Sequence, residues 1–179
     1  ELLGVGGAVE HGTVDADGNR SATTYDVFGR RAVERFTPAP VAGTPPVTFV
    51  TRYTYDDAGR VVKTVREGVS GTGDDRIVKT LSQTETAYES TPQGRTETSI
   101  DSFGRASKSI YDGQGGRLVR TESCDAAGNL LDWTAYEYDE LGRTVRTETR
   151  RGVITETEYD ALGRQWRSTV RTRDGKYRD

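Results

Sequence analysis

One six-residue phrase, Tyr-Asp-x-x-Gly-Arg, recurs along this chain of 179 residues and constrains its fold more than any other feature. Complete copies occupy residues 25–30, 55–60, 138–143 and 159–164. Incomplete copies occupy residues 100–105, 111–117 and 124–129, and a longer variant with Glu in place of Asp covers residues 88–95. Self-similarity of this kind is the sequence signature of a repeat architecture.

Each copy of the phrase carries the residues of a tight hairpin turn. Asp at the first turn position and Gly at the fourth are typical of a type I turn, in which the Asp side chain accepts hydrogen bonds from backbone N–H groups two residues on. Gly then adopts the left-handed conformation that a three-residue hairpin loop with a bulge requires. Tyr and Arg of the same copy are expected at facing strand ends, with the ring and the guanidinium stacked.

The residues to which we assign these turn roles come from the complete copies and from two of the incomplete ones. They are Tyr25, Asp26, Gly29, Arg30, Tyr55, Asp56, Gly59, Arg60, Asp101, Gly104, Arg105, Tyr111, Asp112, Tyr138, Asp139, Gly142, Arg143, Tyr159, Asp160, Gly163 and Arg164.

Between the turns the chain has the composition of β-strands. Alternating polar, β-branched and Tyr residues predict strands at 52–55, 134–138, 144–149 and 155–159. From Asp101 to Asp139 each step between motif Asp residues leaves room for one strand, so successive turns should lie at opposite edges of a ribbon. The longer step from Asp139 to Asp160 leaves room for an out-and-back pair.

We therefore predict an all-β fold, an antiparallel β-hairpin solenoid that forms a curved sheet over residues 1–179. Loop insertions are expected near residues 37–46, which are rich in Pro, and near residues 68–75, which are rich in Gly. Non-integral spacing of the copies argues against identical stacked rungs.

Composition fits a thin sheet better than a thick closed core. Hydrophobic residues make up 32% of the chain, charged residues 30%, and mean hydropathy is −0.73. Disorder is the competing interpretation of this polarity, but nine Tyr and the phased turns argue against it. The net charge of −3 comes from interspersed acidic and basic residues, which predicts no nucleic-acid surface. No apolar run approaches the length of a membrane span.

No residue constellation predicts catalysis, a cofactor or a metal. His11 and Cys124 are the only His and Cys, which excludes an internal disulfide and a zinc site. Cys124 stands where the phrase has Tyr, so we interpret it as a turn-flank residue rather than a nucleophile. Residues 15–19 resemble the start of a calcium loop, but Arg20 replaces the required Gly, and an ordinary turn is expected there. Trp133 and Trp166 are either a binding platform or packing between hairpins.

The repeated phrase resembles the YD-repeat, or RHS-repeat, proteins over roughly residues 15 to 175. This resemblance implies a strip of β-hairpins that spirals into a large hollow shell. In bacterial members the shell encloses a C-terminal toxin, in insecticidal toxin complexes it holds a cytotoxic fragment, and in the animal teneurins a similar barrel serves adhesion. Bacterial shells end in a self-cleaving segment with an Asp-Pro motif, and no Asp-Pro dipeptide occurs in this sequence.

The resemblance leads us to expect a non-catalytic structural segment of a secreted or cell-surface protein. Its partners would be the rest of the parent polypeptide and an enclosed cargo, with no nucleic acid and no membrane insertion. The absence of Met, even at position 1, favours an internal fragment or a processed product. The alternative is an extracellular adhesive or filament-forming module that self-associates through open edge strands or binds a surface ligand.

Overall fold

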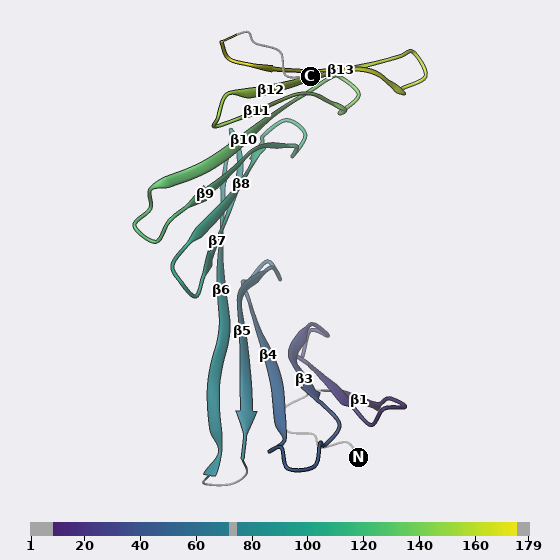
Figure 1. The fold of residues 1–179 in the computed structure, drawn as a ribbon, viewed down its shortest axis with the longest axis vertical. Helices are drawn as coiled ribbons and strands as arrows, with labels where there is room; N and C mark the ends of the chain where they lie inside the picture. Colours follow the sequence, from purple (N-terminus) through teal and green to yellow (C-terminus); the bar gives the residue numbers. More distant parts are fainter. Residues whose placement is uncertain (1–8, 72–74, 175–179) are drawn as a thin grey trace. The chain divides into compact units, whose positions relative to one another are not determined.

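The computed structural model describes residues 9–71 and 75–174, and these ranges contain β-strands and turns but no α-helix. The strands form an open antiparallel sheet of 13 strands whose order follows the sequence (Figure 1). They are β1 (Val9–Val14), β2 (Arg20–Tyr25), β3 (Arg31–Thr37), β4 (Val47–Tyr55), β5 (Val61–Ser70), β6 (Ile77–Thr91), β7 (Gly94–Asp101), β8 (Ala106–Asp112), β9 (Leu118–Cys124), β10 (Leu130–Tyr138), β11 (Thr144–Thr149), β12 (Val153–Tyr159) and β13 (Gln165–Thr172). The predicted all-β antiparallel architecture is confirmed, and the four predicted strands lie within β4, β10, β11 and β12.

The chain divides into two compact units, residues 1–86 and 87–179, with the boundary inside β6. Because each strand pairs with its sequence neighbours, the turns of each unit form two rows, one at each end of the strands. We call each row of turns an edge of the unit. In the first unit, the complete copies follow β2 and β4 and so share one edge. In the second unit, they follow β10 and β12 and again share one edge, as the predicted out-and-back step requires.

The turn at Asp26 shows how a complete copy closes its hairpin. The Gly29 N–H donates to the Asp26 carbonyl at 3.0 Å, and the Asp26 N–H donates to the Arg30 carbonyl at 2.8 Å. Gly29 has a φ of 76°, in the left-handed region. These bonds define a type I turn followed by a bulge. The same two bonds occur at the turns of Asp56, Asp101, Asp139 and Asp160.

The strand register corrects the predicted pairing of Tyr with Arg in one copy. Tyr25 lies opposite Arg31, not Arg30, after a register shift between Thr24 and Tyr25. Tyr138 likewise lies opposite Thr144. Arg30 bonds Asp26 and closes the loop, so it forms no strand pair with Tyr25. The first strand pair beyond the bulge therefore joins Tyr to the residue after Arg.

The longer copy at residues 88–95 is not a motif turn. Tyr88 and Glu89 lie inside β6, which continues to Thr91, and Gly94 already begins β7. No Asp stands four positions before an Arg here, so the strand continues until Pro92 ends it. Of the expected insertions, residues 38–46 form the loop between β3 and β4. In the second, residues 68–70 are not a loop but the end of β5, paired with β6, and residues 72–74 lie outside the described residues.

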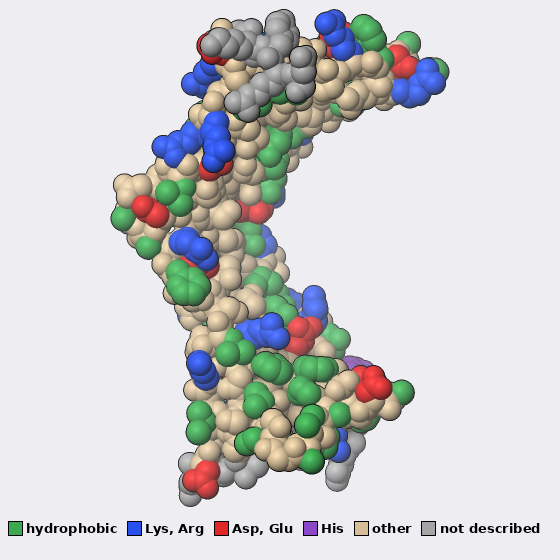
Figure 2. All heavy atoms as spheres, in the orientation of Figure 1, with side chains coloured by type: hydrophobic (Ala, Val, Ile, Leu, Met, Phe, Trp, Pro, Cys, Tyr) green, Lys and Arg blue, Asp and Glu red, His purple; other side chains and the backbone are tan. Residues whose placement is uncertain are grey.

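The sheet has almost no enclosed core. Among the described residues, the buried hydrophobic side chains are Val50, Cys124 and Ile154. Large apolar side chains at the turn tips are exposed, at Phe28, Phe103, Leu141 and Leu162. Figure 2 shows acidic and basic side chains interspersed on the visible face rather than gathered by sign. This arrangement agrees with the thin, wetted sheet that the composition predicts.

Candidate functional site

The motif Asp side chains are bonded within their own turns. Asp139 Oδ1 accepts the Leu141 N–H at 3.0 Å and the Arg143 N–H at 2.9 Å, and Asp139 Oδ2 accepts Arg143 Nε at 2.7 Å. The same three bonds are made at Asp26, Asp101 and Asp160. Each carboxylate therefore pins two backbone groups and orients one guanidinium.

A further turn of this class occurs where the sequence resembles a calcium loop. Asp15 accepts the Asp17 N–H at 3.0 Å and the Asn19 N–H at 2.9 Å, and Asn19 Nδ2 donates to Asp15 Oδ2 at 2.9 Å. Asn19 thus replaces Arg, as Asn129 does beside Asp125. The spacing of Asp, Gly and Asn in 124–129 is the signal that could have identified this turn. No group of three or more His, Cys, Asp or Glu suited to a metal ion occurs in the described part of the chain.

The motif Arg side chains join one hairpin to the next. The Arg143 guanidinium lies over the Tyr159 ring, 4.4 Å from its centroid, and the Tyr159 hydroxyl donates to the Thr144 carbonyl at 3.0 Å. Tyr159 belongs to the next copy along the same edge of the unit. We call this combination, a motif Arg stacked on the following Tyr whose hydroxyl bonds the carbonyl after that Arg, the Arg–Tyr relay.

The Arg–Tyr relay recurs in both units. In the first, Arg30 lies 4.4 Å from the Tyr55 ring centroid, and the Tyr55 hydroxyl donates to the Arg31 carbonyl at 2.7 Å. In the second, Arg117 lies 5.7 Å from the Tyr138 ring, and that hydroxyl donates to the Leu118 carbonyl at 2.7 Å. The stacking therefore links consecutive copies, whereas the sequence predicted stacking inside each copy.

The contribution of a Tyr hydroxyl of the Arg–Tyr relay to stability can be tested by a Tyr→Phe substitution, which removes only that oxygen atom. We expect Tyr159→Phe to lower the free energy of unfolding by about 1 kcal/mol, because the Thr144 carbonyl loses its donor. Tyr25→Phe is the matched control, since the Tyr25 ring packs edge-on against His11 and its hydroxyl bonds none of the described residues. Urea denaturation of both variants measures the difference. Equal losses in the two variants would contradict the relay.

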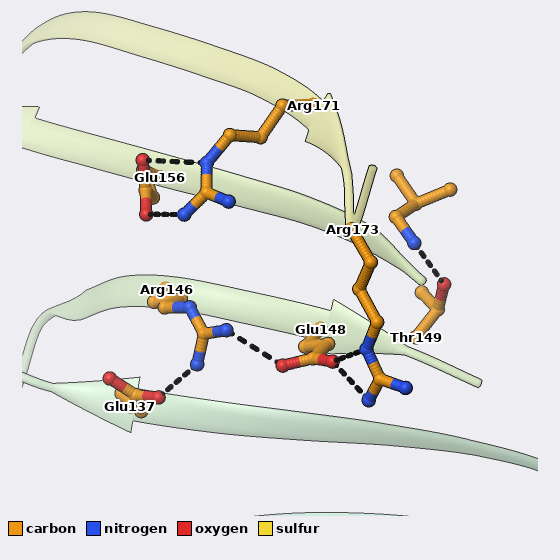
Figure 3. A network of polar contacts seen from close by, with 8 residues as sticks. Glu137, Arg146, Glu148, Thr149, Glu156, Arg171 and Arg173 are labelled. Carbon is orange, nitrogen blue, oxygen red and sulfur yellow. Dashed lines mark hydrogen bonds and ion pairs between the residues drawn. The ribbon is translucent and has the colours of Figure 1, made fainter. Parts of the chain in front are cut away.

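A ladder of ion pairs crosses the strands β10 to β13 in the second unit (Figure 3). Arg146 bonds Glu137 and, at 2.7 Å, Glu148, and Arg173 Nη2 approaches the same Glu148 at 2.5 Å. Arg171 pairs with Glu156 at 2.6 Å. Two of these pairs join adjacent strands, Arg146 with Glu137 on β10 and Arg171 with Glu156 on β12, and such pairs stabilise the strand register. Glu148 on β11 is bonded by Arg146 of its own strand and by Arg173, which follows β13.

The acidic groups of the turns and the ladder have lowered pKa values. The Arg143 backbone N–H holds the pKa of Asp139 below its ordinary 3.8, and the Arg164 backbone N–H does so for Asp160. The Arg173 side chain holds the pKa of Glu148 below its ordinary 4.5. A carboxylate with a lowered pKa in the folded state contributes stability that is present above its unfolded pKa and is lost as pH falls through the folded pKa.

We therefore expect the chain to lose stability in acid. The melting temperature should be level near neutral pH and fall below about pH 4, where the turn carboxylates become protonated in the unfolded state first. Asp160→Asn removes one such group, so its melting temperature should depend less on pH in this range. A melting temperature that stays constant from pH 6 to pH 3 would contradict the assignment.

The remaining candidate residues have local structural environments. Cys124 is buried at the end of β9, and His11 lies on β1 in the other unit. Trp133 has the Arg120 guanidinium 4.5 Å from its ring and Arg173 at 5.9 Å, which favours packing between strands at this position. Trp166 is largely exposed on β13.

Comparisons with known proteins place the chain in no family. No protein-family model and no curated protein matches it. Among solved structures, it is similar to a porin-like protein from Bacteroides uniformis ATCC 8492, with 16% sequence identity and a TM-score of 0.41. The match covers 78% of this chain and 54% of that protein, so the chain spans about half of its length. The described residues include no helix long and apolar enough to cross a membrane.

Proposed function

We propose that this chain is a non-catalytic wall segment of a large YD-repeat, or RHS-repeat, protein, in which a curved solenoid of β-hairpins forms part of a shell around a toxin or similar cargo. The observation that supports the proposal is the Arg–Tyr relay. At three junctions, from Arg30 to Tyr55, from Arg117 to Tyr138 and from Arg143 to Tyr159, it joins one hairpin to the next along an edge of a unit, as a continuous wall of repeats requires.

The mechanism of such a wall is exclusion. Ladder hydrogen bonds hold the backbone of every strand, and the motif Asp side chains hold the turns, so few backbone segments can open to a protease. Among the described side chains, no buried polar atom is left without a hydrogen bond. A wall made of such a thin sheet needs few residues to enclose a cavity, because its stability comes from strand ladders and turns rather than from a thick hydrophobic core.

The partners in this proposal are the rest of the parent polypeptide and its enclosed cargo. The proposed location is secreted or at the cell surface, without membrane insertion and without nucleic acid. The motif carboxylates support a non-catalytic role, because their lone pairs accept hydrogen bonds from their own turns.

A second candidate function is an adhesive or filament-forming module. The observation that favours it is the open sheet, in which the outermost strands β1 and β13 each have one strand neighbour among residues 9–71 and 75–174. Open strand edges pair with other strands, either from a second copy or from a surface ligand.

Electron microscopy and size-exclusion chromatography separate the two candidates. For the wall segment, we expect the 179-residue chain to elute as a monomer and the parent protein to form closed particles that protect a cargo from added protease. Fibres that lengthen with protein concentration would contradict the wall segment and support the filament.

A further inference from the structure

At the outer edge of β13, Arg164 is a motif Arg over which no Tyr ring lies in the part of the chain that the structure describes. Arg164 is held by Asp160, with Nε donating to Oδ2 at 2.8 Å, as in the other motif turns. Its side chain is nevertheless 72% exposed, whereas Arg30 and Arg143, which are covered by a Tyr ring, are each 30% exposed. Arg105, for which the following copy has Cys124 in the Tyr position, is 63% exposed. Arg164 is therefore as exposed as expected for a motif Arg that no Tyr ring covers.

The strand register defines where the missing ring would lie. Tyr159 pairs with Gln165 as Tyr138 pairs with Thr144, so the Gln165 carbonyl is equivalent to the Thr144 carbonyl that accepts the Tyr159 hydroxyl. A strand added to β13 in the β11–β12 register would place a Tyr against Arg164 and bring its hydroxyl to the Gln165 carbonyl.

The charges along β13 specify a second residue of the added strand. Arg164 and Arg167 repeat the spacing of Arg143 and Arg146 on β11. On β12, Glu156 lies opposite Arg146. Arg167 pairs with Glu158 at 3.6 Å and is still 58% exposed, so its guanidinium can also contact a carboxylate on a further strand. The complementary strand therefore has Glu three positions before Tyr, as β12 itself does.

We propose that the outer edge of β13 is a docking site for an antiparallel strand of sequence Glu-x-x-Tyr-Asp, supplied by another YD hairpin. This proposal rests on the proposed wall function and names the partner of its open edge. A second copy of this chain is a poor occupant through β1, because β1 has Val14 before Asp15 and His11 in the Glu position. Edge pairing at β13 is thus selective for a Tyr-bearing strand.

A peptide with the sequence of residues 153–160 is the probe for this site. We expect it to bind the full 179-residue chain saturably and to slow hydrogen exchange of the amides in β13 while leaving β11 unchanged. In the peptide, Tyr→Ala should weaken binding about tenfold and Tyr→Phe about threefold, since the first removes ring and hydroxyl and the second only the hydroxyl. These peptide variants leave the protein unaltered, so its folding does not enter the comparison.

Variants of the protein provide the matched control. Arg164→Ala should weaken peptide binding about fivefold, whereas Arg105→Ala, which loses the same bond to its turn Asp, should not change it. Equal binding of the wild-type and Tyr→Ala peptides, protection of β11 instead of β13, or no saturable binding would overturn the docking site. Closed particles from the parent protein would still support the wall function in that case, so the two proposals fail separately.

Discussion

Replacing Ile154 by Ala should lower the free energy of unfolding by about 3 kcal/mol, the largest effect expected of any single substitution in this chain. Ile154 is 4% exposed on β12 and is one of three buried hydrophobic side chains among the described residues. In a sheet with so little enclosed apolar surface, each buried side chain carries a large share of the hydrophobic stabilisation.

The matched control for Ile154 is Ile100→Ala in the same unit. Ile100 is 43% exposed on β7, so its truncation should cost less than about 1 kcal/mol. Urea denaturation, analysed with a common slope, measures both variants. Equal losses at the two positions would show that burial at Ile154 does not contribute to stability as we infer.

Replacing Gly142 by Ala should lower the free energy of unfolding by about 1–2 kcal/mol, the second largest effect. Gly142 has a φ of 80°, and an added Cβ would meet no atom within 4 Å, so the whole cost comes from the left-handed backbone. Gly163→Ala, at a φ of 79°, should behave alike, although its Cβ would lie 3.6 Å from the Arg143 guanidinium.

Gly68→Ala is the control for both turn substitutions. Gly68 lies inside β5 without a positive φ, and its added Cβ would meet side chains at 3.7 Å, which is ordinary contact. Alanine there should be neutral or slightly stabilising, because it restricts the unfolded chain. Thermal melts that are unchanged in Gly142→Ala and Gly163→Ala would contradict the turn assignment.

The turns were predictable because their chemistry is local. Asp139 and Gly142 are close in sequence, and the bonds they make depend on the backbone between them. The same locality explains why a turn was expected at Asp15, although Asn19 stands in the position of the motif Arg. At residues 88–95, the missing Asp removed the local signal, and the strand continued instead.

The partners of Tyr and Arg were not predictable from the phrase. Arg143 and Tyr159 belong to different copies, and they meet because β12 returns beside β11. Placing Tyr opposite the residue after Arg also depends on the bulge, which shifts the register by one position. A stacked pair inside one copy is compatible with the sequence, but in the structure Arg30 and Arg143 lie over the Tyr ring of the following copy.

The phrase Tyr-Asp-x-x-Gly-Arg, by itself, determined hairpins, their turn type and an all-β sheet, because Asp and Gly act on the backbone within one turn. Only the tertiary structure decided what Tyr and Arg do. Pairing of neighbouring hairpins brings Arg30, Arg117 and Arg143 each against the next Tyr along an edge, as at Arg30 and Tyr55. That contact requires strands distant in sequence to lie in register, and no local pattern encodes it.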